Sequence, residues 1–277
     1  MTALLGVRQV LRSLAQELEV LPAVGGAVED LERPDFEERE DQALNEEERV
    51  FDTVFERDPT APRLPLYRPT PPLRRHACHR YRYFLDGSFR SYFLGTILEH
   101  ERESPVHLAQ VGACVLRRED DGAVRREALR VDTVLLAGRV RISAEVWRKL
   151  ESWTAQFGIR LIDLTEQDVV SQVLGDFDLR NKAAGKVRYA MHLLEAELLR
   201  QVLPCLSEDR WLVLDGSLLF NPTLTVLGEG EQITPVIGVA KNFRKDPQFV
   251  WGRGPRAERR SIYRLLAELP AEHRTAA

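Results

Sequence analysis

Two short segments of the chain repeat one pattern, in which an aspartate follows an apolar run and precedes Gly-Ser. FLDGS covers residues 84–88 and VLDGS covers residues 213–217. An aspartate before glycine is typical of a tight turn. A carboxylate at the end of a buried strand is costly unless a cation or a hydrogen-bond donor compensates its charge. The repeated pattern therefore indicates either two ordinary turns or one polar site shared by Asp86 and Asp215.

A third acidic residue lies on the helix predicted between these segments, over residues 186–203. Glu195 borders the apolar face of this helix when the residues are placed at a spacing of about 100°. One interpretation is an ion pair with Arg188, which lies about two helical turns away on the same side. The other interpretation is that Glu195 points at Asp86 and Asp215 and shares a divalent metal with them.

Three clustered carboxylates suit hard divalent cations, because Mg²⁺ and Mn²⁺ prefer oxygen ligands. Such ions activate water and stabilise the leaving oxygen of a phosphodiester. The cation also offsets the repulsion between the carboxylates, which would otherwise strain the site. The three acids therefore predict a metal-dependent site for phosphodiester chemistry.

The paired LDGS segments, the acid-bearing helix before the second of them, and GVAKN at residues 238–242 together resemble the NurA nuclease family. The resemblance covers roughly residues 81–275. It implies an RNase H-like fold and Mn²⁺-dependent degradation of DNA, with 5′→3′ exonuclease and single-strand endonuclease activity in end resection and recombinational repair. It also implies a homodimer that works with a HerA-type hexameric ATPase.

The resemblance assigns roles to particular residues of this chain. By position, Asp86, Glu195 and Asp215 match the metal-binding acids of the family. Glu197 is the alternative for the helix acid, because the spacing to Asp215 allows either glutamate. Lys241 matches the family's lysine and is expected to contact the scissile phosphate as a point charge.

One departure from the family pattern concerns the C-terminus. Family members continue past the segment that resembles LPAEHRT, at residues 269–275, into a strand region with a tyrosine and a histidine near the metal. This chain stops at Ala277, so we expect an incomplete site with reduced activity. The alternative is a non-catalytic RNase H-like module that docks DNA or a HerA-type ATPase. A phosphate-handling enzyme of another kind is disfavoured, because no GxxxxGK[ST] loop occurs.

Basic residues concentrate between Lys241 and Arg264, where eight Lys and Arg stand against two acidic residues. Cations bind phosphates, and interleaved aromatic rings can stack on unpaired bases. The segment 242–255 is therefore the predicted DNA contact. Its proposed contact residues are Arg244, Lys245, Trp251 and Arg253. For the helix predicted over residues 255–269 alone, a solvated helix face with aromatic residues in the core is the preferred explanation.

Two N-terminal segments of unusual composition precede the helices and strands that must position these residues. Leucines at helical spacing predict an N-terminal amphipathic helix, and residues 29–57 carry 13 acidic against 4 basic residues. Six prolines between residues 59 and 72 then predict an extended connector. We therefore expect an N-terminal extension over residues 1–72 and a nuclease domain over residues 73–277, in which the N-terminal helix packs on its own domain or docks on another subunit.

Within the second segment, strands and helices alternate after an initial run of strands, which predicts an α/β fold with a mixed sheet flanked by helices. Helix 143–158 has Ser143 as its N-cap and Gly158 as its stop. The predicted strands are 80–89, 91–98, 106–116, 131–138, 211–220 and 233–243, and the predicted helices are 143–158, 186–203 and 255–269.

Composition limits the remaining classes of function. The chain has 277 residues and a formal net charge of −4, which excludes a uniformly basic nucleic-acid coat. Three cysteines without a CxxC pair fit a reducing cytoplasm, and Cys114 and Cys205 are expected to be core thiols. HACH at residues 76–79 lacks the second pair that a structural zinc site needs. No apolar run is long enough for a membrane span.

Overall fold

The computed structural model describes residues 3–23, 66–71, 79–167, 179–216, 218, 221–228, 235–239, 248–251 and 258–275. The chain divides into two compact units, the first formed by residues 1–43 and 80–240 and the second by residues 44–79 and 241–277. This division groups the chain differently from the predicted boundary near residue 73, because the N-terminal helix belongs to the same unit as the sheet.

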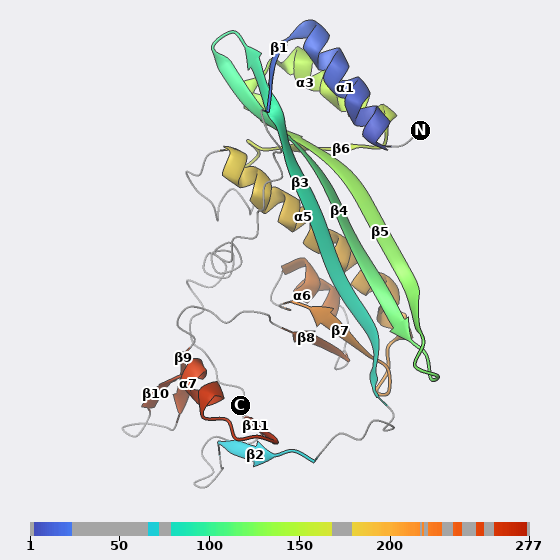
Figure 1. The fold of residues 1–277 in the computed structure, drawn as a ribbon, viewed down its shortest axis with the longest axis vertical. Coiled ribbons are helices and arrows are strands. Elements are labelled where there is room, and N and C mark those ends of the chain that lie inside the picture. Colours follow the sequence, from blue (N-terminus) through green and yellow to red (C-terminus); the bar gives the residue numbers. More distant parts are fainter. Residues whose placement is uncertain are drawn as a thin grey trace. The chain divides into compact units, whose positions relative to one another are not determined.

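The first unit is built on a seven-stranded mixed sheet (Figure 1). Its main path has the order β6-β5-β4-β3-β7-β8, and a short strand β1 also pairs with β3. Strands β3, β4 and β5 form an antiparallel meander, while β7 runs parallel to β3 and β8 parallel to β7. The strands are β1 (Glu19–Pro22), β3 (Tyr81–Glu99), β4 (Arg102–Arg118), β5 (Val124–Ala137), β6 (Arg160–Asp163), β7 (Trp211–Asp215) and β8 (Val236–Val239). The predicted α/β class with a mixed sheet flanked by helices is confirmed at this level.

Strand β3 is one continuous strand, although two strands over residues 80–89 and 91–98 were predicted here, with a Gly-Ser turn within the first segment. Asp86, Gly87 and Ser88 pair in register with Cys114, Ala113 and Gly112 of β4. The ladder with β4 satisfies the backbone across this segment, so the Gly-Ser pair does not form a turn. Asp86 therefore lies within a strand, whereas Asp215 is the last residue of β7, as predicted.

The sheet has a different cover on each face. One face packs against α5 (Leu179–Val202), which contributes Val187, Leu194 and Leu198 to an apolar cluster with Leu85 of β3. The other face is covered at one end by α1 (Ala3–Glu17) and α3 (Ala144–Gln156). Side chains alternate between the faces along each strand, so neighbouring residues such as Leu135 and Leu136 enter different clusters.

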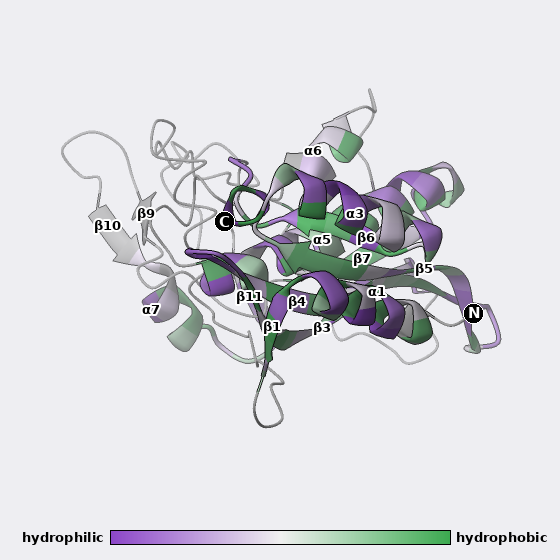
Figure 2. Ribbon diagram, turned by 90° about the horizontal axis from the view of Figure 1, so that it is seen from above, coloured by the Kyte–Doolittle hydropathy of each residue, from purple (hydrophilic) through white to green (hydrophobic). Residues whose placement is uncertain are grey.

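The N-terminal helix is amphipathic, with hydrophilic and hydrophobic residues alternating around it (Figure 2). Its residues Val7, Val10 and Leu14 are buried in the cluster that contains α3. The chain then continues into β1, which pairs antiparallel with the far end of β3. Of the two predicted arrangements, the described residues therefore show α1 packed on its own unit.

Helix α3 begins and ends as predicted. The Ser143 side chain accepts a hydrogen bond from the Val146 N–H at 3.3 Å, and Gly158 adopts φ of 65° just after the helix. The predicted helix over residues 255–269 is shorter in the structure. Residues Glu258–Ser261 instead form strand β10, which pairs with β9, and α7 covers only Ile262–Ala267.

The second unit contains two small antiparallel pairs and α7. Strand β9 (Gln248–Trp251) pairs with β10, and β2 (Tyr67–Pro69) pairs with β11 (His273–Thr275). The Tyr67 hydroxyl donates a hydrogen bond to the Leu265 carbonyl at 2.8 Å, which fixes β2 against α7. Among the described helices of the whole chain, none is both long and apolar enough to cross a membrane.

Candidate functional site

Asp86 and Asp215 lie on neighbouring strands of the first unit. In the parallel ladder between β3 and β7, Phe84 pairs with Val213 and Leu85 with Leu214. Asp86 and Asp215 are the next residue on each strand, and paired residues of parallel strands point to the same face. Asp86 is exposed and Asp215 is half-buried. The structure thus brings the two strand aspartates to neighbouring positions, which is one of the two arrangements that the repeated motif indicates.

Backbone contacts on both sides fix the position of Asp215. It pairs with Val239 of β8, and the following Gly216 N–H donates a hydrogen bond to the Val239 carbonyl at 3.0 Å. Gly216 has φ of 142°, a conformation that residues with a side chain rarely adopt. The glycine after the second aspartate therefore turns the chain out of the sheet directly behind the carboxylate.

Glu195 lies on the opposite face of the sheet from these aspartates. A Cβ atom built on Gly87 would stand 2.6 Å from Glu195 Oε1, so Gly87 faces helix α5. Because alternate residues of a strand point to opposite faces, Asp86 must point away from α5. The expectation that Glu195 joins both aspartates at one metal is wrong for this arrangement, and the cause is that β3 continues through the Gly-Ser segment without a turn.

The Glu195 carboxylate has a local partner instead. It is 4% exposed, and its Oε2 lies 2.7 Å from His192 Nδ1, one helical turn earlier on α5. Arg188, the partner considered from the sequence, places its guanidinium 6.0 Å from the centre of the Phe89 ring. Glu197 is exposed on α5 and does not replace Glu195 at the aspartates. The His192 contact was missed, although the spacing of three residues on a helix could have indicated it.

The number and type of side chains that lie together determine which kind of metal site this structure can form. Within the described part of the chain, no group of three or more His, Cys, Asp or Glu side chains could hold a metal ion. Two carboxylates on one face nevertheless fit Mg²⁺ or Mn²⁺, which proteins often hold through one or two carboxylates together with substrate phosphates and water. The geometry therefore fits a cation at Asp86 and Asp215 without Glu195.

Several predicted residues fall outside the described structure. Lys241, Arg244, Lys245 and Arg253 are among them. Trp251 is the last residue of β9 in the second unit, and only its backbone is described.

Two further predictions concern thiols. Cys114 is half-buried and Cys205 is exposed, so the expectation of two core thiols is wrong. Cys205 ends a short turn in which Pro204 follows helix α5, and this turn lies at the surface.

Beside Asp86, part of the sheet is left without a covering helix among the described elements. We call this surface the open face. It consists of the residues of β3, β4, β5 and β7 that point away from α5 and lie beyond the cluster of α1 and α3. Its members are Arg82, Phe84, Asp86, Ser88, Arg90, Tyr92, Gln110, Gly112, Cys114, Leu116, Arg118, Val124, Arg126, Leu129, Val131, Thr133, Val213 and Asp215.

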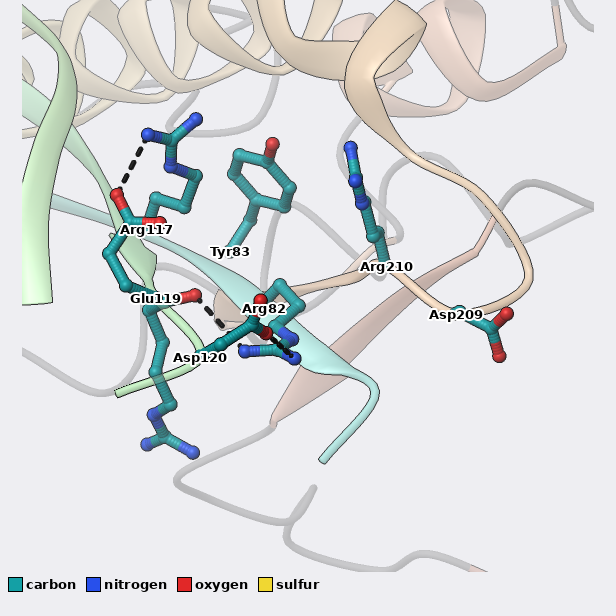
Figure 3. A pocket seen from close by; sticks show the side chains of 8 residues that line it. Arg82, Tyr83, Arg117, Glu119, Asp120, Asp209 and Arg210 are labelled. Carbon is teal, nitrogen blue, oxygen red and sulfur yellow. Dashed lines mark hydrogen bonds and ion pairs between the residues drawn. The ribbon is translucent and has the colours of Figure 1, made fainter. Parts of the chain in front are cut away.

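One end of the open face meets a pocket at the start of β3 (Figure 3). Four arginines and three acidic residues line it together with Tyr83. Arg82 pairs with Asp120 at 2.5 Å, and the side chain of Asp209 turns away from the group. The lining residues are Arg82, Tyr83, Arg117, Arg118, Glu119, Asp120, Asp209 and Arg210.

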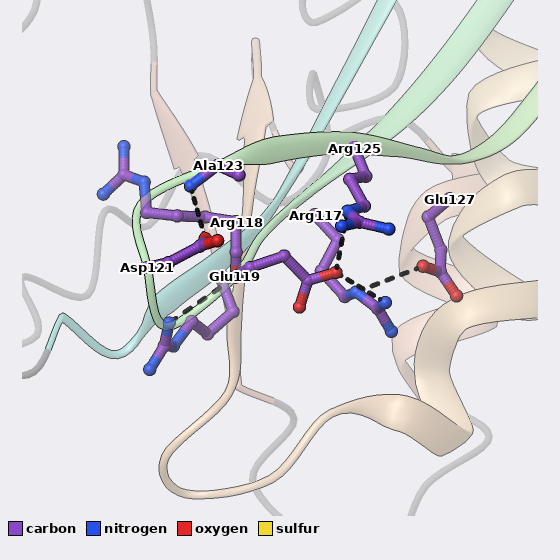
Figure 4. A network of polar contacts seen from close by, with 8 residues as sticks. Arg117, Arg118, Glu119, Asp121, Ala123, Arg125 and Glu127 are labelled. Atoms are coloured by element: carbon purple, nitrogen blue, oxygen red, sulfur yellow. Dashed lines mark hydrogen bonds and ion pairs between the residues drawn. The ribbon is translucent and has the colours of Figure 1, made fainter.

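The arginines at this end differ in how far their charge is already compensated (Figure 4). Glu119 accepts a hydrogen bond from Arg117 at 2.8 Å and lies 3.8 Å from Arg125. The contact with Glu119 is the main reason that the pKa of Arg117 is raised, and Glu127 adds to it. Arg118, by contrast, lies with its guanidinium 5.0 Å from the centre of the Phe84 ring. Among the described residues, Arg118 thus contacts an aromatic ring and no carboxylate.

No family model, curated protein or solved structure matches this chain. The functional assignment therefore depends on the sequence resemblance and on the geometry of Asp86, Asp215 and the open face.

Proposed function

We propose that this chain is a metal-dependent deoxyribonuclease in which Asp86 and Asp215 hold the divalent cation. The observation that supports this most is the parallel pairing of β3 with β7, which brings the two aspartates of the repeated LDGS motif to neighbouring positions on one face. Two carboxylates side by side repel each other, and a bound cation relieves that repulsion. Mn²⁺ is the proposed ion, with Mg²⁺ as the alternative.

The order of the elements supports an RNase H-like fold as part of the same proposal. An antiparallel meander of β3, β4 and β5 leads through helix α5 to β7, which returns beside the first strand of the meander. The connection continues through α6 (Asn221–Gly228) to β8, which is parallel to β7. This arrangement puts the two motif aspartates on the central strands, where neighbouring ladders hold their backbones.

The residues of this chain would have separate roles in metal binding and in phosphate binding. A divalent cation at this position supplies activation of water and stabilisation of the leaving oxygen. Asp86 is exposed, so a phosphodiester can approach it, while Asp215 is fixed by the hydrogen bond behind it. Lys241 is proposed from the resemblance as a contact to the scissile phosphate. A homodimer and a HerA-type ATPase are likewise proposed as partners in DNA end resection and recombinational repair.

The test is digestion of end-labelled single-stranded DNA in the presence of Mn²⁺. We expect Asp86→Asn and Asp215→Asn each to reduce cleavage by at least about a hundredfold, since each removes a charged ligand and leaves the fold in place. Glu197→Gln is the matched control, because it neutralises an exposed glutamate that does not lie at the aspartates. Full activity of both aspartate variants would refute the assignment.

A non-catalytic module is the second candidate, and one observation favours it. Glu195, the acid that the resemblance assigns to the metal, lies on α5 against Gly87, on the opposite face of the sheet from the aspartates. Under this alternative the protein binds DNA or an ATPase without cutting. Purified protein that binds DNA but leaves it intact at every Mn²⁺ concentration would select this candidate.

A further inference from the structure

We infer that the open face is a track for single-stranded nucleic acid that runs along β3 past Asp86. This inference deepens the proposed nuclease function and rests on it for the identity of the ligand. The predicted DNA contact lay elsewhere, in residues 242–255. The track is inferred from described residues of the first unit alone.

The first argument is the uncovered apolar surface. Leu129 is 46% exposed and Val131 is 53% exposed, and both belong to β5, which pairs with β4 along this stretch. Leu116 and Tyr92 of the neighbouring strands are exposed on the same side. Single exposed apolar residues are ordinary, but Leu116, Leu129 and Val131 lie near one another on adjacent strands. Such a group on a sheet face marks a surface that binds something.

The second argument is the distribution of charge along the face. Arg82 and Arg118 lie level with each other about four residues before Asp86, and Arg90 lies four residues after it. At about 3.3 Å per residue, these cations flank the aspartate pair at roughly 13 Å on either side. Arg126 adds a further cation beside Leu116. Four arginines thus accompany two aspartates, although the charge of Arg82 is already compensated by Asp120. A cation bound at the aspartates would make the face more positive still.

The third argument is the presence of aromatic rings beside these cations. The Phe84 ring lies under the Arg118 guanidinium, so this planar cation is presented in a fixed orientation. Tyr92 is 38% exposed and stands two residues beyond Arg90 on the same face. Cations that follow a backbone, combined with rings on which bases stack, are the usual features of a surface for single strands.

A single strand fits these features better than a second copy of the chain. Two copies packed face to face would bring the arginines of each face toward those of the other, and like charges in a low-dielectric interface are costly. A single strand instead offers phosphates to the arginines, and its unpaired bases can cover Leu129, Val131 and Tyr92.

The experiment measures binding of a fluorescein-labelled oligothymidylate to the full chain by anisotropy, with EDTA present so that cleavage does not interfere. We expect the double variant Arg90→Gln/Arg118→Gln to bind at least about tenfold more weakly, with a shallower dependence on salt. Tyr92→Ala should weaken binding by about tenfold through lost stacking, with little change in salt dependence. The matched control is Arg8→Gln/Arg12→Gln, which removes two exposed arginines of α1 that are not members of the open face.

Each outcome decides the inference separately from the nuclease proposal. Weaker binding by the open-face variants, with the α1 control unchanged and all melting temperatures alike, supports the track even if the protein never cuts DNA. Equal binding by all variants overturns the track even if Mn²⁺-dependent cleavage requires Asp86. A change in the sedimenting mass of the Tyr92 variant with unchanged DNA binding would also overturn it, because the face would then join two copies.

Discussion

Gly87 lies directly against the Glu195 carboxylate. A Cβ atom at residue 87 would be 2.6 Å from Glu195 Oε1 and 2.9 Å from Met191 Cγ, both on helix α5. The close approach of strand β3 and helix α5 thus depends on a residue without a side chain. It also fixes the direction of the neighbouring residue, since Asp86 must then point to the other face.

The first prediction follows from this contact. Gly87→Ala should lower the free energy of unfolding by about 1–3 kcal/mol, because the added methyl group displaces a buried carboxylate or a methionine side chain. The measurement is urea denaturation of the purified chain. Gly228→Ala serves as the control, since nothing lies within 4 Å of a Cβ built there. Equal stability of the two alanine variants would show that β3 and α5 do not approach as closely as described.

The second prediction concerns Glu195 itself. If the cation is held by Asp86 and Asp215, Glu195→Gln should retain Mn²⁺-dependent cleavage to within about tenfold, because the amide can still contact His192. Cleavage of end-labelled single-stranded DNA measures this, with Asp86→Asn as the reference for loss. Loss of activity equal to that of the aspartate variant would instead place Glu195 at the metal, as the family resemblance implies.

The third prediction concerns helix α1. Leu14→Ala should destabilise the first unit by about 2–5 kcal/mol, because Leu14 is fully buried between α1 and α3. Leu5→Ala on the same helix should change stability by less than about 0.5 kcal/mol, since Leu5 is 54% exposed. Thermal unfolding followed by circular dichroism compares the two. If α1 served only to join subunits, Leu14→Ala would change the sedimenting mass and leave the melting temperature of the monomer unaltered.

Local signals in the sequence predicted much of the fold, while the site depended on long-range pairing. Helix α3 begins after Ser143 and ends just before Gly158, as expected, because the signals that start and stop a helix act within one helical turn. The Gly-Ser pair after Asp86 was predicted as a turn because turn chemistry is also local. The Gly-Ser pair remains in an extended strand because β4, about 25 residues away in the sequence, pairs with it continuously. This one difference moved Asp86 to the face opposite Glu195.

The fourth prediction concerns the ion pairs of Lys149, a residue of α3 that contacts Glu17 of α1. Lys149 Nζ lies 2.6 Å from Glu17 Oε2 and 3.0 Å from Glu145 Oε1. Its hydrogen bond to Glu17, and then that to Glu145, raise the pKa of Lys149, and the contact with Lys149 lowers the pKa of Glu145. Because the pKa of the Glu145 carboxyl is lowered, its ion pair stabilises the folded chain at pH values above about 4.3, and this stabilisation is lost as the pH falls. Because the pKa of Lys149 is raised, its ion pairs stabilise the folded chain at pH values below about 10.4, and this stabilisation is lost as the pH rises further.

Lys149→Met should therefore melt at a lower temperature than the parent chain at pH 7, and the difference should shrink at pH 3, where the glutamates are protonated. The difference should also shrink in 1 M NaCl, because these side chains are partly exposed and salt screens them. Arg12→Gln is the control for loss of one positive charge, because Arg12 is an exposed residue of α1 for which the described residues show no ion pair. A difference between parent and Lys149→Met that stays constant from pH 3 to pH 7 would assign the effect to packing of the lysine stem rather than to its charge.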